Sequence, residues 1–358
     1  MLSTQVVRAG GFLYLSGVSA SDARGDVGAA TRGVLEQAGS ALSSAGSSLA
    51  QVVSILVFIR SASDFQAMND AYRAFWTSDF PTRTTLVTEL PTPGALVEMT
   101  IIAAEAGGER VVVHPRDWAV SPSPYSYAIK SADTVFLSGL VSRNGRDNSA
   151  VAGDVATQTR VILENAGELL DAAGLSHANI VSSRVYLTDV SSFGAMNETY
   201  RAYFASAPPA RATVQSALAG PQYDVEITFT ASSSPRRVIT EGLPPNLNLP
   251  LSAAIVAGQR VYLSGALGFD DTNKGNVAAQ TRETLARLRR TLAAADRAPS
   301  DVVESTVYVT DLKDLSEVDR EYRAFFGSHA PARTTIRSGL VAADGLVEIM
   351  LTATEKHG

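Results

Sequence analysis

Residues 184–230 read RVYLTDVSSFGAMNETYRAYFASAPPARATVQSALAGPQYDVEITFT, and this stretch decides the fold. It opens on a β-branched and aromatic run, which is typical of a buried strand. An amphipathic segment follows and predicts a helix, which the next prolines end. The apolar stripe of that helix comprises Phe193, Met196, Tyr200 and Phe204. Two further apolar runs, at 211–218 and 224–232, predict two more strands.

The same blocks recur in the same order twice more, at 55–101 and 306–351. A short run ending in Ser-Gly precedes each of them, and the three serines are 122 and 126 residues apart. These serines are Ser16, Ser138 and Ser264. Copies of about 120 residues are long enough for each to hold its own hydrophobic core. We therefore predict three domains, at 1–110, 111–235 and 236–358, with the lead-in strand of the first one truncated.

Between the Ser-Gly run and the quoted stretch, residues 155–170 have helical spacing, and Gly174 is a plausible end for that helix. Each copy then becomes an α+β domain of order ββαβαββ. Two helices cover only one face of such a sheet, so the other face must be buried against something else. We expect the three copies to close into an intrachain pseudo-trimer that buries these bare faces.

Composition narrows the possible functions. The 358 residues include no cysteine, which excludes disulfides, a thiolate nucleophile and sulfur-bound zinc. A net charge of −6 argues against a nucleic-acid-binding surface. No signal peptide or long apolar run is evident, so we expect a cytoplasmic protein that does not interact with membranes.

An arginine and a glutamate recur fifteen residues apart in every copy. The pairs are Arg83 and Glu98, Arg211 and Glu226, and Arg333 and Glu348. The sequence places them on successive strands of one predicted hairpin, where a structural salt bridge would explain them. Alternatively, arginine binds a carboxylate bidentately, and a nearby carboxylate can position a water. Such a pair suits cofactor-independent hydrolysis of an electrophilic C=N carbon.

Each copy resembles the Rid (YjgF-like) family. The second copy carries PYSYAIKSADTVFLSG, VYLTDV, MNETYRAYF, PARATV and DVEITF in the family's order, and the third carries VYVTDL, YRAFF, PARTTI and LVEIML. The resemblance implies chorismate-mutase-like domains that form a trimer, or here a pseudo-trimer, with sheets inside, helices outside and active sites between neighbouring domains. It also implies that these sites hydrolyse imines and enamines to 2-oxo acids and ammonia without a metal or cofactor.

The resemblance assigns roles to residues of this chain. The three arginines would bind the carboxylate of a small-molecule substrate, and the three glutamates would orient the attacking water. Further substrate-binding positions fall on Tyr125, Ser16, Ser138, Ser264, Asn69 and Asn197. Asp319 replaces the asparagine in the third copy, and Leu251 replaces the tyrosine there. The three sites therefore cannot be chemically equal, and the neighbour that Tyr125 faces stays open.

Two other functions remain open. The family's glutamine after Ser-Gly is absent from all copies, which favours a specialised biosynthetic or catabolic enzyme on the same scaffold. Chorismatase-like enol-ether hydrolysis, deamination of a ring-cleavage product and imine cyclisation are forms of this alternative. The third possibility is a non-catalytic ligand-binding or chaperone-like module. In each case we expect a monomeric chain.

Overall fold

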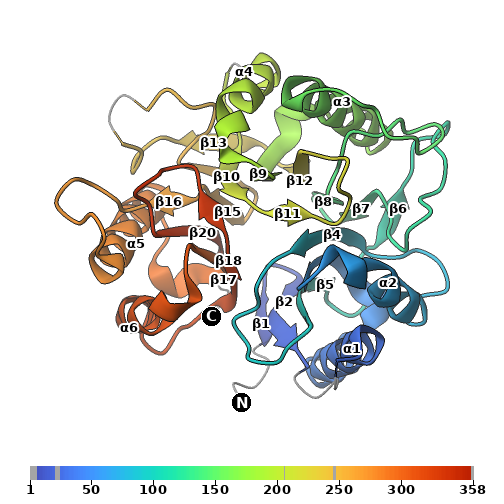
Figure 1. The fold of residues 1–358 in the computed structure, drawn as a ribbon, viewed down its shortest axis with the longest axis horizontal. Coiled ribbons are helices and arrows are strands. Elements are labelled where there is room, and N and C mark those ends of the chain that lie inside the picture. The colour runs from blue at the N-terminus through green and yellow to red at the C-terminus, as the bar shows by residue number, and fades with distance from the viewer. Residues whose placement is uncertain (1–5, 21–24, 205, 245–246, 356–358) are drawn as a thin grey trace.

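The computed structural model describes residues 6–20, 25–204, 206–244 and 247–355. Within them the chain forms three mixed sheets and six helices (Figure 1). The helices are α1 (Val27–Ser44), α2 (Phe65–Arg73), α3 (Val155–Ala172), α4 (Phe193–Tyr203), α5 (Val277–Ala294) and α6 (Leu315–Phe326). Asp26, Asp154 and Asn276 cap the N-termini of the three long helices.

The first copy has the predicted order ββαβαββ. Its sheet runs β1 (Val6–Ala9), β2 (Phe12–Ser19), β5 (Val97–Ala104), β3 (Val52–Ile59), β4 (Thr82–Val87), and then takes β11 (Ala217–Leu218) from the second copy. The predicted shortening of the lead-in strand concerns residues 1–5, which lie outside the described residues.

The other two copies add short strands to the same order. The second sheet runs β19 (Gly339–Leu340), β10 (Ala210–Gln215), β9 (Ile180–Leu187), β12 (Val225–Ser232), β8 (Thr134–Leu137), β7 (Ala128–Ser131), β6 (Val111–Val113). The third sheet runs β13 (Arg236–Ile239), β14 (Ala254–Ala257), β15 (Arg260–Leu263), β20 (Val347–Thr354), β17 (Val302–Val309), β18 (Ala332–Arg337), and β16 (Ala266–Leu267) also pairs with β20.

The predicted hairpin is wrong. In the first copy β3 lies between β4 and β5, parallel to the former and antiparallel to the latter. A parallel neighbour requires a crossover, which α2 provides between β3 and β4. Arg83 on β4 and Glu98 on β5 are therefore not on adjacent strands, and the second and third copies repeat this order.

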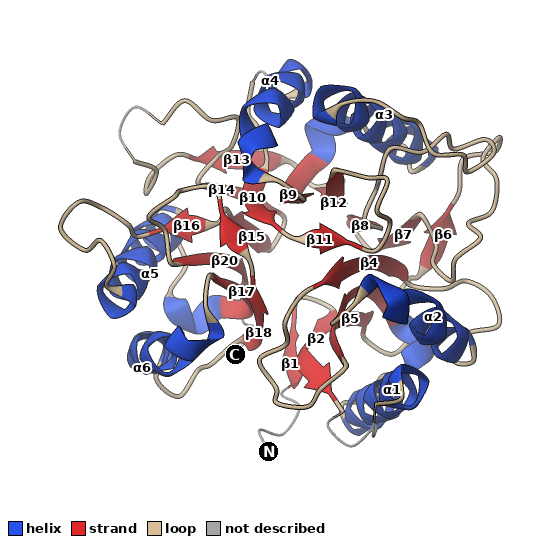
Figure 2. Cartoon of the chain, in the orientation of Figure 1, coloured by secondary structure: helices blue, strands red, loops and turns tan. Residues whose placement is uncertain are grey.

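The sheets lie inside and the helices outside, as expected (Figure 2). One apolar cluster in each copy lies between its helices and its sheet. A further cluster joins the inner faces of all three sheets, with Phe58, Tyr186 and Tyr308 among its fully buried members. The bare sheet faces are thus buried against one another, which removes their apolar surface from water.

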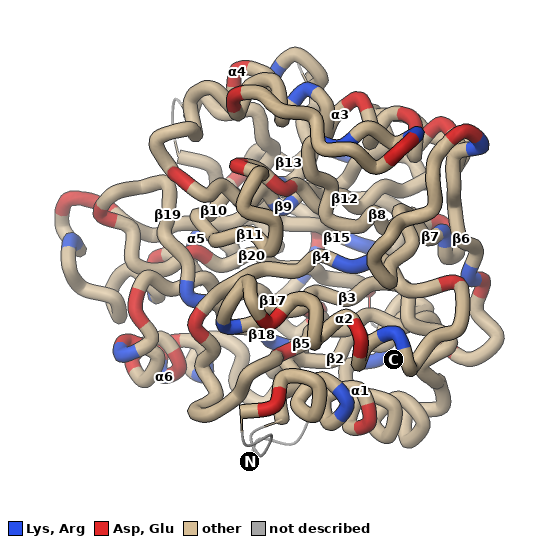
Figure 3. Tube along the Cα trace, turned by 45° about the vertical axis from the view of Figure 1, so that its right-hand side comes forward, with Lys and Arg blue, Asp and Glu red and all other residues tan. Residues whose placement is uncertain are grey.

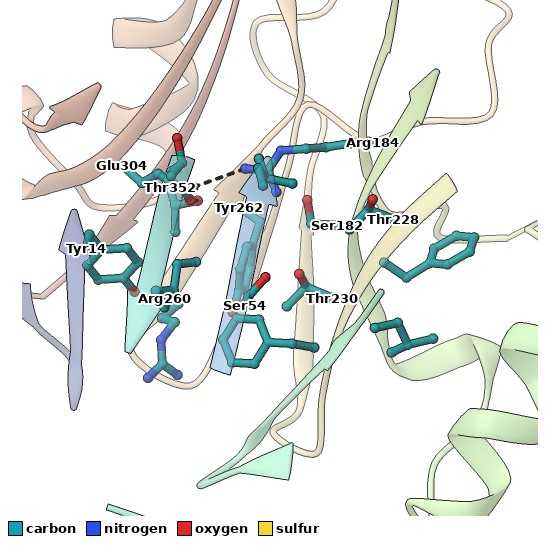
Figure 4. A pocket seen from close by; sticks show the side chains of 16 residues that line it. Tyr14, Ser54, Ser182, Arg184, Thr228, Thr230, Arg260, Tyr262, Glu304 and Thr352 are labelled. Carbon is teal, nitrogen blue, oxygen red and sulfur yellow. Dashed lines mark hydrogen bonds and ion pairs between the residues drawn. The ribbon is translucent and has the colours of Figure 1, made fainter. Parts of the chain in front are cut away.

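Hydrogen bonds join the copies around the ring. Strand β11 pairs with β4, and β19 pairs with β10. At the third boundary the Thr88 hydroxyl donates to the Arg337 carbonyl at 2.7 Å. The interior is partly polar: Figure 4 shows Arg184 of the second copy in an ion pair with Glu304 of the third, 3.4 Å apart, beside a cavity of about 30 Å³.

Charged residues of both signs are interspersed along the outer elements (Figure 3). Among the described residues, no helix combines the length and the apolar character needed to cross a bilayer.

Candidate functional site

Each arginine faces the glutamate of the next copy around the ring rather than that of its own copy. The charge of Arg83 acts on Glu226, that of Arg211 on Glu348, and that of Arg333 on Glu98. We call these three arrangements the first, second and third sites. All of them lie between copies.

The serine of the Ser-Gly run joins the two sides of a site. In the first site the Ser138 hydroxyl accepts a hydrogen bond from the Arg83 amide at 2.9 Å and donates to the Ser126 carbonyl at 2.7 Å. The Gly139 amide donates to the Arg83 carbonyl at 3.1 Å. In the second site, Ser264 and Gly265 repeat these contacts with Arg211. These contacts tie the arginine strand of one copy to the Ser-Gly run of the next.

Replacing Ser138 with alanine leaves the buried Arg83 amide without its acceptor. We expect the free energy of unfolding to fall by about 1–2 kcal/mol, the usual cost of an unsatisfied buried donor. Urea unfolding measures this change. The matched control is Ser149→Ala in an exposed turn, which we expect to change stability by less than about 0.5 kcal/mol. Equal effects of the two substitutions would contradict the role given to Ser138.

The glycine after that serine makes room for the glutamate. A Cβ on Gly139 would lie 1.8 Å from Glu226 Oε1, and a Cβ on Gly265 would lie 1.9 Å from Glu348 Oε1. Gly17 stands in the same relation to Glu98, at 2.2 Å. Each carboxyl group therefore lies directly against a glycine backbone. Any larger residue at that glycine would force the glutamate side chain to move.

Burial controls the protonation of these glutamates. It raises the pKa of Glu226 and of Glu348 to about 8, and that of Glu98 to about 7, while the facing arginine acts in the opposite direction in each case. Carboxyl groups with a pKa near neutrality can both accept and donate a proton at working pH, as general acid–base catalysis requires.

Aromatic rings lie beside the arginines. The Arg83 guanidinium carbon is 5.1 Å from the centre of the Tyr72 ring, and the corresponding distances are 4.9 Å from Arg211 to Tyr200 and 4.8 Å from Arg333 to Tyr322. These tyrosines are buried, and each also contacts the guanidinium through its ring. Their constant spacing of eleven residues before the arginine was the signal for this pairing.

The three arginines differ in their partners. Among the described residues, Arg83 and Arg211 make no ion pair. They are 4% and 1% exposed, and each has a buried nitrogen without a hydrogen-bond partner. Arg333 instead forms an ion pair with Asp319 at 2.7 Å, and its side chain is 26% exposed. A buried guanidinium without an anionic partner is costly, so an anion that reached Arg83 or Arg211 would be bound favourably.

The predicted asparagines take the helix position that Asp319 occupies in the third copy. Asn69 on α2 and Asn197 on α4 are buried, and the Oδ1 atom of each has no hydrogen-bond partner. In the third copy the residue at this position, Asp319, contacts Arg333.

Tyr125 belongs to the first site. Its ring centre is 5.8 Å from the Arg83 guanidinium carbon, so the arginine that the sequence left undecided is Arg83. A cavity of about 110 Å³ is lined by both residues and by Glu226. The same cavity is lined by Phe65, Arg143 and Tyr223, which sequence reasoning missed. Arg143 and Tyr223 do not recur between copies, so no repeat marks them. Phe65 does recur, as Phe193, whose ring centre is 5.9 Å from the Arg211 guanidinium carbon, and that repeat was the signal that could have found it.

The family model described as Endoribonuclease L-PSP matches residues 3–105, 119–233 and 244–355. The chain belongs to this family. Its resemblance to the Rid (YjgF-like) proteins is thereby confirmed, three times along the chain.

Single-domain relatives match one L-PSP copy. The chain is 41% identical over 92 residues to a RutC family protein of Sulfurisphaera tokodaii, and this match covers 26% of this chain and 74% of that protein. It is 37% identical over 112 residues to the human 2-iminobutanoate/2-iminopropanoate deaminase, and this match covers 31% of this chain and 82% of that protein. A solved chorismatase is similar over 85% of this chain and 93% of its own, with a TM-score of 0.60 and 16% identity, a level that shows a shared fold alone.

Proposed function

We propose that this chain hydrolyses reactive 2-imino acids, and the enamines that tautomerise to them, to 2-oxo acids and ammonia. The observation that carries the proposal is the buried Arg83 guanidinium, which has no anionic partner in the described residues and shares a cavity with Glu226 across the boundary between copies. The names of the 2-iminobutanoate/2-iminopropanoate deaminases among the relatives support the same reaction.

In the proposed reaction Arg83 binds the substrate carboxylate, while the Tyr72 ring packs against the guanidinium. Glu226 orients a water toward C2 of the imine and accepts its proton as the C–O bond forms. The substrate enters as the iminium, so this addition gives a carbinolamine with a neutral amino group. Glu226 returns its proton to that nitrogen. As the C–N bond breaks, the hydroxyl proton passes to Glu226, the C=O bond forms and ammonia leaves. One water is consumed, the proton brought by the iminium passes from Glu226 to solvent, and no cofactor is needed.

The test supplies imines from an L-amino acid oxidase acting on L-2-aminobutyrate. Semicarbazide traps the free imine, so faster hydrolysis by the chain appears as less trapped product. We expect the wild-type chain to lower trapping in proportion to its concentration, while the Glu226→Gln variant does so far less. Equal trapping with and without the chain, under conditions where a single-domain deaminase is active, would overturn the proposal.

We propose that the third site is inactive because the chain occupies its own carboxylate clamp. Asp319 lies 2.7 Å from the Arg333 guanidinium, where a substrate carboxylate would bind. The chain would then work as a monomeric pseudo-trimer with one or two active sites.

Replacing Asp319 with asparagine tests that assignment. We expect Arg333 to become free, and 2-oxobutanoate titrated by calorimetry to show one additional binding site per chain. Glu317→Gln, on the exposed side of the same helix, is the control for loss of an acidic charge. Unchanged stoichiometry in the Asp319 variant would mean that this aspartate does not block the site.

A specialised enzyme on the same scaffold is the second candidate, and the inequality of the cavities favours it. Beside Ser264 and Gly265 of the second site lies a cavity of about 380 Å³ with a mainly apolar lining that includes Leu251 and Phe269. Activity confined to one large substrate, with no hydrolysis of small imines, would support this candidate over the first.

A further inference from the structure

The first site holds a second cation. Arg143 follows Gly139 by four residues and lines the same cavity as Arg83 and Glu226. Its backbone is held in place, because the Asn165 side-chain amide donates to the Arg143 carbonyl at 2.7 Å. The loop that carries the Arg143 side chain is therefore anchored to α3.

Only neutral groups accompany the Arg143 guanidinium. Its carbon is 5.4 Å from the centre of the Tyr223 ring, and Nη1 donates to the Asn148 carbonyl at 3.3 Å. No carboxylate of the described residues lies within 4.0 Å of its nitrogens. Arg143 is thus a second arginine that faces the cavity without an anionic partner.

Tyr125 lies within reach of both cations. Burial raises the pKa of its hydroxyl, and the charges of Arg143 and Arg83 both oppose that rise. The remaining acid of the site, Glu226, has a pKa raised to about 8 by burial and is largely neutral at pH 7. At neutral pH the cavity therefore carries two positive charges that the protein does not offset.

The second site lacks this feature. Phe269 stands four residues after Gly265, where Arg143 follows Gly139, and Leu251 replaces Tyr125. Tyr223, three residues before Glu226, corresponds to Gly345 before Glu348. The second cation and the groups around it are therefore particular to the first site.

We propose that the first site is selective for 2-imino acids that carry a second carboxylate. Arg83 binds the carboxylate next to the imine carbon, Arg143 binds the distal one, and the reacting carbon lies between them beside Glu226. The imine is hydrolysed as described above, and the distal carboxylate forms and breaks no bond. A dianion matches two guanidinium groups that a monocarboxylate would leave half unpaired. The inference rests on the proposed function for the identity of the reacting group.

The 2-oxo acid products are stable and allow binding to be measured without turnover. We expect calorimetry to show that 2-oxoglutarate binds the full chain at one site, about tenfold or more tighter than 2-oxobutanoate, since a buried charge-assisted pair is worth at least that factor. In Arg143→Leu the ratio of the two affinities should fall toward one, and Arg143→Lys should retain part of it. Arg146→Leu removes the same charge three residues away, at an exposed position, and should keep the wild-type ratio.

Three results would overturn the inference: equal affinity for the two acids, three equivalent 2-oxoglutarate sites per chain, or an unchanged ratio in a folded Arg143→Leu variant. The semicarbazide assay separates this failure from that of the proposed function. Hydrolysis of 2-iminobutanoate without any dicarboxylate preference overturns the inference alone. Tight binding that depends on Arg143, with no imine hydrolysed, overturns the proposed function and supports the second carboxylate pocket.

Discussion

We expect replacement of Arg83 with lysine to lower kcat/KM for the proposed imine hydrolysis by about 100-fold, the size expected when a bidentate, charge-assisted contact in a buried site is lost. Lysine keeps the positive charge but offers no planar pair of donors, and its ammonium does not stack on Tyr72 as a guanidinium does. The effect should appear mainly in KM, because the substrate carboxylate is held in both the ground state and the transition state.

Two other arginines serve as comparisons. Arg60→Lys makes the same chemical change at an exposed position, and activity should stay within about twofold of wild type. Arg333→Lys should cost at least tenfold less than Arg83→Lys, because Arg333 is already paired with Asp319. Equal losses for Arg83 and Arg333 would show that the sites are equivalent and would remove the reason for placing the chemistry in the first site.

Replacing Glu226 with glutamine removes the proton acceptor, and we expect kcat to fall by about 100-fold or more, the usual range for a general base. In the proposed reaction the deprotonated Glu226 carboxylate is the active form. Because burial raises the pKa of Glu226 to about 8, activity should rise with pH and level off above that value. The glutamine variant should show a flat residual profile between pH 6 and 9.

Stability gives a second readout of the same group. The folded chain holds the Glu226 proton more tightly than the unfolded chain, whose pKa is near 4.5. The stabilisation that this group contributes is therefore complete below pH 4.5 and is lost as pH rises through about 8. Above pH 8 the Glu226→Gln variant should be more stable than wild type, measured by urea unfolding. A wild-type rate that falls as pH rises from 6 to 9 would contradict the role of Glu226 as a base.

Relations within one copy could be predicted from the sequence. The apolar spacing of 155–170 predicts α3, and the recurring blocks predict the order ββαβαββ. The threefold repeat also pointed to buried inner sheet faces, because two helices cannot cover both sides of a sheet. The glycine of the Ser-Gly run was recognised as a motif, although its reason, the approach of Glu226 to Gly139, needed coordinates.

Relations between copies could not be predicted in the same way. Equal spacing of arginine and glutamate suggested a hairpin, but strand β3 separates β4 from β5, and the partner of Arg83 comes from the next copy. Arg143 gave no signal, because a residue present in one copy has no repeat to mark it.

The repeated sequence by itself determined three domains of one topology and the residue types that each brings to a site, because periodicity and turn chemistry act over short stretches of chain. Only the tertiary structure decided which groups meet and which sites stay free of an internal partner. Pairing across a boundary depends on how sheet faces pack, and the free energy of a charge depends on its distance from other charges and from water. Neither quantity can be predicted from residue spacing. The sites have similar motifs but differ, because Asp319 pairs with Arg333 in the third site and Arg143 lines the same cavity as Arg83 in the first.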